Sequence, residues 1–179
     1  ASVDTGVDYT HPDLKASLWV NQAELPDWSL EAGIDLNGDG YVSSIEIEEF
    51  LIIEGMDNNA DGTVNLRDLV CEGSGFLDGS DADGNGYADD IIGWDASGYY
   101  ANSPADPDPY PREGATPTGT WAHGTHVAGI LAATTDNGVG ISSTSYNAKI
   151  ISVKVSRGSQ PSEPGISDGY AGITYAAKA

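Results

Sequence analysis

Cysteine, basic residues and long apolar runs are scarce in this chain. Its one cysteine, Cys71, excludes an internal disulfide, and we expect an idle thiol. Only 7 bases face 28 acids, which gives a net charge of −21. Such a surface repels nucleic acid and anionic membranes, so we expect neither as a partner. No apolar run is long enough to cross a bilayer.

The apolar residues that are present suffice for one core. They make up 39% of 179 residues. The patterns predict a strand ending at Ser2-Val3, helices over 44–53 and 123–133, a strand over 148–155, and a last helix through Ala177 capped by Ser167 or Asp168. Prolines predict a surface loop over 99–119. Helices that follow strands in this order predict an α/β layered fold with a parallel sheet.

One acid and one histidine have the setting of a catalytic pair. Asp4 ends the first strand just before Gly6, where the chain can turn sharply, and His123 opens a helix of small residues. Imidazole suits proton transfer near neutral pH, and a carboxylate can orient it. Asp4-Thr5-Gly6 could instead be half of an aspartic-protease dyad, but no second such triplet exists. His123 and His126 could bind a metal, but no third ligand is near, so we expect His126 to be packed.

Two segments then resemble the subtilisin-like serine proteases, or subtilases. They are Asp4-Thr5-Gly6-Val7-Asp8-Tyr9-Thr10-His11-Pro12-Asp13-Leu14 and Ala122-His123-Gly124-Thr125-His126-Val127-Ala128-Gly129-Ile130. The resemblance covers most of the chain outside residues 30–80. It implies a three-layer subtilisin-like α/β fold with a parallel sheet, polypeptide substrates, Asp4 as the orienting acid and His123 as the general base.

The nucleophile that the resemblance implies is missing. No Gly-Thr-Ser-Met-Ala segment is present. Gly165-Ile166-Ser167-Asp168-Gly169 matches a Gly-x-Ser-x-Gly elbow, but a loop precedes it and no histidine follows. We therefore expect Ser167 to be a helix cap. We also expect the natural protein to extend beyond both ends of this sequence, and the sequence as given to be an inactive fragment.

Two segments with oxygen ligands at alternate positions predict calcium loops. Both match the 12-residue EF-hand pattern, with glycine at the sixth position. Their ligand positions are Asp35, Asn37, Asp39, Tyr41, Ser43 and Glu46, and then Asp57, Asn59, Asp61, Thr63, Asn65 and Asp68. Turns rich in Asp, Asn and Gly also occur without metal. The paired loops resemble a dockerin repeat, so we expect residues 31–80 to be an EF-hand/dockerin-like insertion with a possible protein partner.

Two further calcium sites are expected. The third loop has Asp81, Asp83, Asn85 and Tyr87, but Ile92 stands where a carboxylate would close it, so Asp89 or Asp90 is expected to do so. It resembles a calcium loop of bacterial subtilases. The family resemblance implies a fourth site, with side-chain oxygens from Asp13 and Asn137.

The sequence thus predicts a partial peptidase catalytic domain over 1–179 with an insertion over 31–80. We expect a fragment of a secreted, calcium-dependent serine endopeptidase whose serine lies outside this sequence. The alternative is a non-catalytic extracellular calcium-binding or adhesion module on a degenerate peptidase scaffold. The downstream sequence distinguishes the two.

Overall fold

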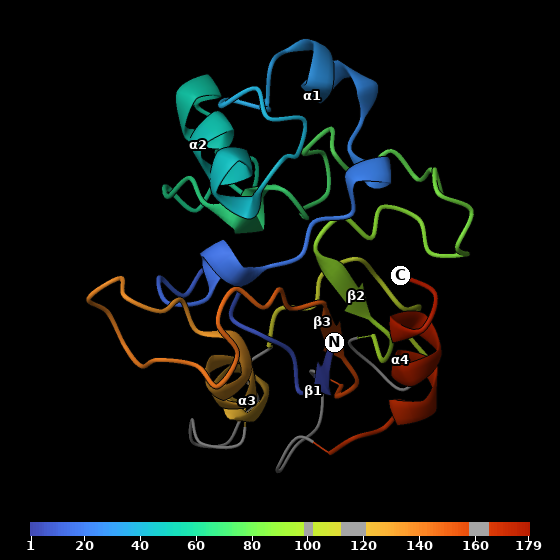
Figure 1. Cartoon of the computed structure of the whole chain (residues 1–179). Coiled ribbons are helices and arrows are strands. Elements are labelled where there is room, and N and C mark those ends of the chain that lie inside the picture. Colours follow the sequence, from blue (N-terminus) through green and yellow to red (C-terminus); the bar gives the residue numbers. More distant parts are fainter. Residues whose placement is uncertain (99–101, 112–120, 158–164) are drawn as a thin grey trace.

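A parallel sheet of three strands joins segments that are far apart in the sequence. The computed structural model describes residues 1–98, 102–111, 121–157 and 165–179 (Figure 1). The strands are β1 (Ser2–Asp4), β2 (Gly93–Asp95) and β3 (Ser152–Lys154), in the spatial order β1-β3-β2. In the register, Asp4 and Asp95 both lie beside Lys154. The carboxyl ends of all three strands therefore meet at one edge of the sheet.

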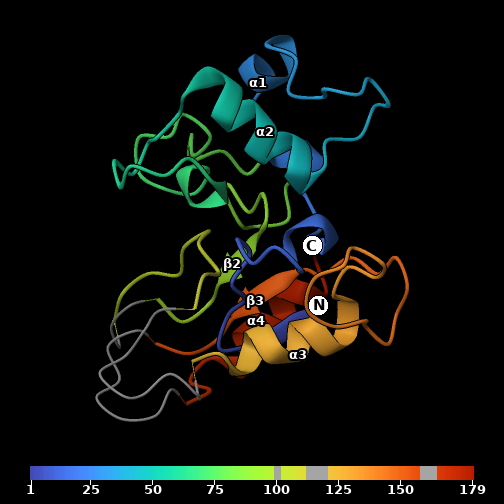
Figure 2. The same cartoon turned by 90° about the vertical axis from the view of Figure 1, so that its left-hand side faces the viewer.

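Two helices cover opposite faces of this sheet, α3 (His123–Ala132) and α4 (Gly169–Ala176) (Figures 1 and 2). On the α3 side, Ala128 is buried in a cluster with Val7, Leu14 and Ile150. On the α4 side, Gly172 lies so close to the sheet that a Cβ there would be 2.4 Å from Val155. Small residues thus bring both helices against the strands, and the predicted three-layer α/β fold is confirmed.

Residues 18–92 form a second lobe beyond the sheet, at the top of Figure 1. It contains η2 (Gln22–Glu24), α1 (Asp27–Glu31), α2 (Ser44–Glu54) and η3 (Leu66–Asp68), while η1 (Lys15–Ser17) lies between the lobe and the sheet. A capping box between Ser43 and Glu46 starts α2, and Gly55, with φ of 67°, ends it. The helix predicted over 44–53 is therefore confirmed and extends one residue further.

Some predicted boundaries were wrong. The strand expected over 148–155 pairs regularly only at β3, and Ile150 forms a single bridge with Leu18. Ser167 does not cap α4, because both its amide and its hydroxyl donate to the Val155 carbonyl. Asp168 does stand at the expected N-cap position of α4, although its side chain makes no capping bond. Residues 99–101 and 112–120 of the predicted proline-rich loop lie outside the described residues.

Candidate active site and calcium loops

The acid at the end of β1 meets the histidine at the start of α3. His123 Nδ1 donates to Asp4 Oδ1 across 2.7 Å, although 119 residues separate them. The same oxygen accepts the Thr5 amide at 2.7 Å. The Asp4 side chain is 15% exposed and the imidazole 62% exposed. The carboxylate thus holds one ring nitrogen, and the other nitrogen is on the exposed side of the pair.

Thr5 fastens the two segments to each other. Its hydroxyl donates to the Trp121 carbonyl at 3.2 Å and accepts the Gly124 amide at 3.0 Å. A second tie lies at the next residue of α3, where Thr125 Oγ1 accepts the Asp8 amide at 2.9 Å. The first turn of α3 is thereby fixed to the chain on both sides of Gly6, and this sets the place of the imidazole.

Glycine at position 124 makes the close approach possible. A Cβ there would lie 2.2 Å from the Gly6 carbonyl oxygen and 3.1 Å from Asp4 Cβ. Gly6 has φ of 101° and faces Pro109, whose carbonyl accepts the Val7 amide at 3.2 Å. The helix therefore packs directly onto the backbone of the turn after β1. Any larger residue at position 124 would push His123 away from Asp4.

A buried ion pair lies on the same row of the sheet as Asp4. Lys154 Nζ donates to Asp95 Oδ2 at 2.5 Å, and both side chains are 0% exposed. Asp95 Oδ1 also accepts the amide and hydroxyl of Ser97. A buried charge with so many partners is tolerated, whereas either charge without the other would be costly.

His126 was expected to be packed, and that expectation was wrong. It lies on α3 with its side chain exposed. One turn of helix earlier, His123 bonds to Asp4 at the end of β1. No described residue forms a three-ligand group with it.

The first EF-hand-like loop is organised by its own carboxylates. Asp35 accepts two backbone amides of the loop, at 2.8 and 3.0 Å, and Glu46 accepts one more at 3.1 Å. Asn37 and Asp39 each accept an amide two residues ahead, at 2.8 Å. Ser43 donates its amide and hydroxyl to Glu46. The predicted oxygen ligands therefore lie around one turn, and the Tyr41 backbone is part of it.

The electrostatics of Glu46 differ from those of an exposed acid. Burial by itself would raise its pKa. The hydrogen bonds from the amide and hydroxyl of Ser43 and from the Asn37 amide outweigh that effect, and the pKa is lowered from 4.5. The charged carboxylate is therefore the favoured form at the end of this loop.

The second loop has the same pattern of amide–carboxylate hydrogen bonds, but its last acid is the shorter Asp68 where the first loop has Glu46. Asp57 accepts two loop amides at 3.1 and 3.0 Å, Asn59 and Asp61 each accept one, and Asp68 accepts two at 3.0 and 2.9 Å. Asn65 Oδ1 accepts the amide of the second residue of η3. The three-residue η3 follows this loop where α2 follows the first. Thr63 donates its amide to Asp61, so all six predicted positions belong to the turn.

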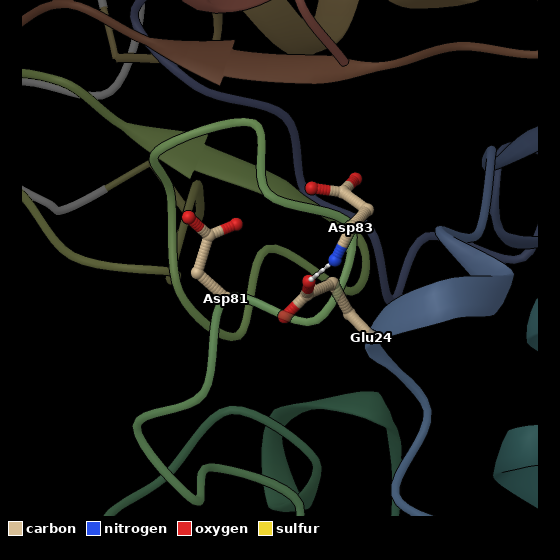
Figure 3. A group of neighbouring side chains, drawn as sticks. All are labelled: Glu24, Asp81 and Asp83. Carbon is tan, nitrogen blue, oxygen red and sulfur yellow. Dashed lines mark hydrogen bonds between the residues drawn. The ribbon is translucent and has the colours of Figure 1, made fainter.

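A residue from another segment enters the third loop. One carboxylate oxygen each from Glu24, Asp81 and Asp83 lies within 4.8 Å of the others (Figure 3). Glu24 Oε1 accepts the amides of Ala82 and Asp83 at 2.7 and 3.1 Å, and Oε2 accepts the Asp89 amide at 2.9 Å. Glu24 was not among the candidate ligands predicted from the sequence. The one available signal was its place between the apolar residues Ala23 and Leu25, because burial of a carboxylate costs free energy unless the group has hydrogen-bond partners.

The two acids expected to close the third loop have different surroundings. Asp89 accepts the amides of Asp78 and Gly79, outside the group around Glu24. Asp90 is 0% exposed and accepts the side-chain amides of Asn21 and Asn85. Burial raises the pKa of Asp90 to about 6, against the lowering effect of its hydrogen bonds. Tyr87 of the same loop packs its ring on Trp94 and Tyr175.

The fourth predicted pair is also brought together. Asn137 Nδ2 donates to Asp13 Oδ1, and the Ile141 amide donates to Asp13 Oδ2, both at 2.9 Å. The loop lines an open hollow of about 240 Å³. Gly140 leaves room for the acid, since a Cβ there would lie 2.0 Å from Asp13 Oδ2. Asp13 is thus enclosed by a loop more than 120 residues away in sequence.

Comparison with known proteins agrees with this geometry. The subtilase family model, Peptidase_S8, matches residues 1–177, so the chain belongs to the subtilase family. Over 90 residues it is 38% identical to the extracellular basic protease of Dichelobacter nodosus, covering 49% of this chain and 13% of that protein. Over 155 residues it is 26% identical to subtilisin-like protease 1 of Plasmodium berghei (strain Anka), covering 85% of this chain and 15% of that protein. The chain therefore spans a small part of each relative.

Proposed function

We propose that this chain supplies the acid and base of a serine endopeptidase that cleaves polypeptides. The observation that carries the proposal is the 2.7 Å hydrogen bond between His123 Nδ1 and Asp4 Oδ1 in a subtilase-family domain. The serine and the oxyanion-binding groups come from sequence outside these 179 residues. The relatives' names, both of proteases, support the same reaction class.

The chemistry follows from the orientation of the imidazole. Asp4 accepts the Nδ1 proton, so Nε2 is the nitrogen that can accept a proton from a serine hydroxyl. The hydroxyl oxygen attacks the peptide carbonyl, and His123 then gives the proton to the leaving amine. Asp4 stabilises the imidazolium that forms between these steps. Thr5 and Gly124 hold the pair at hydrogen-bonding distance.

Fluorophosphonate labelling of the natural full-length protein tests the proposal. We expect the wild type to be labelled and to cleave an unstructured protein substrate, and His123→Ala to do neither. The 179-residue chain alone should not be labelled, because it lacks the nucleophile. A folded full-length protein that resists labelling would support the non-catalytic calcium-binding alternative instead.

We further propose that the acidic loops bind Ca²⁺. Hard oxygen ligands are the donors that calcium prefers, and these loops offer carboxylates, side-chain amide oxygens and carbonyls. The Glu24 group fits a cation best, because one oxygen from each of three carboxylates lies within 4.8 Å of the other two. Bound calcium would offset part of the −21 charge. Glu24 joins Asp81 and Asp83 as a proposed ligand, and the ligands proposed for the other loops are those of the sequence analysis.

Terbium luminescence tests the first loop, because Tb³⁺ replaces Ca²⁺ and nearby aromatic rings sensitise it. Glu46→Gln should remove the signal of this loop, since a neutral amide replaces the bidentate acid. Glu49→Gln on the exposed side of α2 is the matched control and should leave it intact. Equal titrations for the two variants would remove the first loop from the proposal.

We propose that the protein is secreted, because the extracellular space is the compartment that suits calcium-binding loops of this kind. EF-hand-type loops in extracellular modules bind calcium at the high concentrations found there. One relative is named an extracellular protease. Among the described residues, no helix has the length and apolarity of a membrane span. Detection of the natural protein in culture medium rather than in cells tests this point.

A further inference from the structure

The insertion and the candidate active site share one core. The largest buried cluster contains Tyr9, five residues after Asp4, together with Ile47 and Phe50 of α2 and Leu66 of η3. Tyr9 is 0% exposed. Residues 31–80 therefore do not pack only on themselves. Their apolar side chains reach the segment that carries the catalytic acid.

Arg67 forms the outer end of this connection. Its guanidinium carbon lies 4.5 Å from the centre of the Tyr110 ring. That ring meets Tyr9 edge to face, with centroids 5.2 Å apart. The Tyr9 hydroxyl and the Tyr110 amide both donate to Asp108 Oδ1, at 2.9 and 3.0 Å. Arg67, the two tyrosine rings and Asp108 therefore form a continuous series of contacts, which runs from the lobe of residues 18–92 to the segment beyond β2.

The inner end of the stack lies against the turn after Asp4. Pro109, between the two residues that bind Tyr9, accepts the Val7 amide at 3.2 Å. The same carbonyl would be 2.6 Å from a Cβ on Gly6. Gly6 is the residue on which the first turn of α3 packs. Through these contacts, a shift of Tyr110 would reach Pro109, the Gly6 turn and the position of His123 relative to Asp4.

We propose that Arg67 is a positioning residue for the His123–Asp4 pair. It acts through Tyr110 and Pro109 on the turn that carries the acid, and for its effect on turnover the proposal rests on the peptidase function above. Arg67 is itself exposed, so its removal leaves no buried cavity. Its influence on the pair can therefore be measured without loss of the fold.

Arg67→Ala in the full-length protein is the test, with Lys178→Ala as matched control. Lys178 also lies over a tyrosine ring, 5.2 Å from the centre of Tyr87, but that ring packs on the α4 side of the sheet. We expect Arg67→Ala to lower kcat by about two- to fivefold, with KM nearly unchanged. Arg67→Lys keeps the cation and should recover most of the rate. In a Tyr110→Leu background, Arg67→Ala should have no additional effect.

A second readout separates this proposal from the peptidase assignment. The His123 Nδ1 proton resonance in NMR should move upfield in Arg67→Ala, because its hydrogen bond to Asp4 loosens, and should stay in place in Lys178→Ala. An unmoved resonance together with a wild-type kcat overturns the positioning role. If the wild type cleaves no peptide, the proposed function fails, and the resonance alone then decides the role of Arg67.

Discussion

The loop half of the molecule, which is the lobe of residues 18–92, and the sheet half, which is formed by the other described residues, use aspartate in opposite ways. Asp4 joins segments that are 119 residues apart, and Asp13 joins a loop even further along the chain. Asp35 and Asp57 instead bind backbone amides no more than five residues away. The partners of the first two acids therefore depend on how distant pieces of backbone approach each other. The partners of the other two belong to their own turn.

This contrast predicts which kind of change destabilises each half. Steric change should damage the sheet half, where Gly124 and Gly172 let helices touch backbone and side chains of the sheet. Chelators and acid should damage the loop half, where many like charges are held close together. The predictions below test this division, beginning with the largest effect.

Loss of the acid of the proposed catalytic pair should have the largest effect on activity and should leave the loops intact. Asp4→Asn in the full-length protein should lower kcat/KM by about 10⁴-fold, because the imidazole loses its orienting charge and its tautomer. Steady-state peptide cleavage measures this loss. Terbium titration of the same variant should match the wild type. A parallel loss of metal binding would show that the halves are not separable in this way.

Two glycines on one helix should respond with opposite signs. Gly124→Ala should lower the free energy of unfolding by about 2–3 kcal/mol, because the new Cβ meets the Gly6 carbonyl. At Gly129 the nearest atom to a Cβ is Ile141 Cδ1 at 3.7 Å, an ordinary contact. Gly129→Ala should therefore stabilise by about 0.5–1 kcal/mol, as in an ordinary helix interior. Urea denaturation compares them, and equal changes would contradict the steric argument.

Calcium removal should act on the loop half first. At free calcium about 100 times a site's Kd, chelation should cost that region about 2.7 kcal/mol. Amide exchange should then accelerate over 35–46 and 57–68 while residues 123–132 keep their protection. Uniform loss of protection over both ranges would mean that the lobes unfold as one unit.

Acid should affect two buried carboxyls of the loop half in opposite directions. The pKa of Glu46 is lowered in the folded state, so its stabilising effect is present above 4.5 and is lost as the pH falls through the folded pKa. The pKa of Asp90 is raised from 3.8 to about 6, so stability falls as the pH rises between these values. Calcium-free denaturation from pH 3 to 7 checks this. Glu46→Gln and Asp90→Asn should each remove one of the two slopes.

The contact between Asp4 and His123 could be predicted because each residue stands in a short segment that carries its own signals. Asp4 and His123 stand in short segments whose neighbours, Gly6 and Gly124, also fix the approach. The two EF-hand-like turns could be predicted for the same reason, since the hydrogen bonds of each turn lie within 12 residues. The parallel sheet followed from the alternation of strands and helices, although β3 proved shorter than its apolar run.

Three other features that depend on distant segments could not be predicted. Glu24 reaches the third loop from 57 residues before Asp81, and no local pattern marks that contact. The place of Tyr9 in one buried cluster with residues of α2 and η3 also depends on tertiary packing. Ser167 matched the cap preference of its residue type, but the Val155 carbonyl competed for its hydroxyl. In each case a long-range partner outweighed the local signal.

The strand order has a consequence for the protein during its synthesis. The middle strand, β3, is the last of the three to be made, and Ser2 finds its partner only at Ser152. Until then β1 and β2 are unpaired edges that can join strands of other chains. The two EF-hand-like turns of the loop half can form before residue 152 is made, because their hydrogen bonds join residues that are close in sequence. A ribosome-bound nascent chain should therefore form the lobe first and require protection from aggregation until residue 154 has left the exit tunnel.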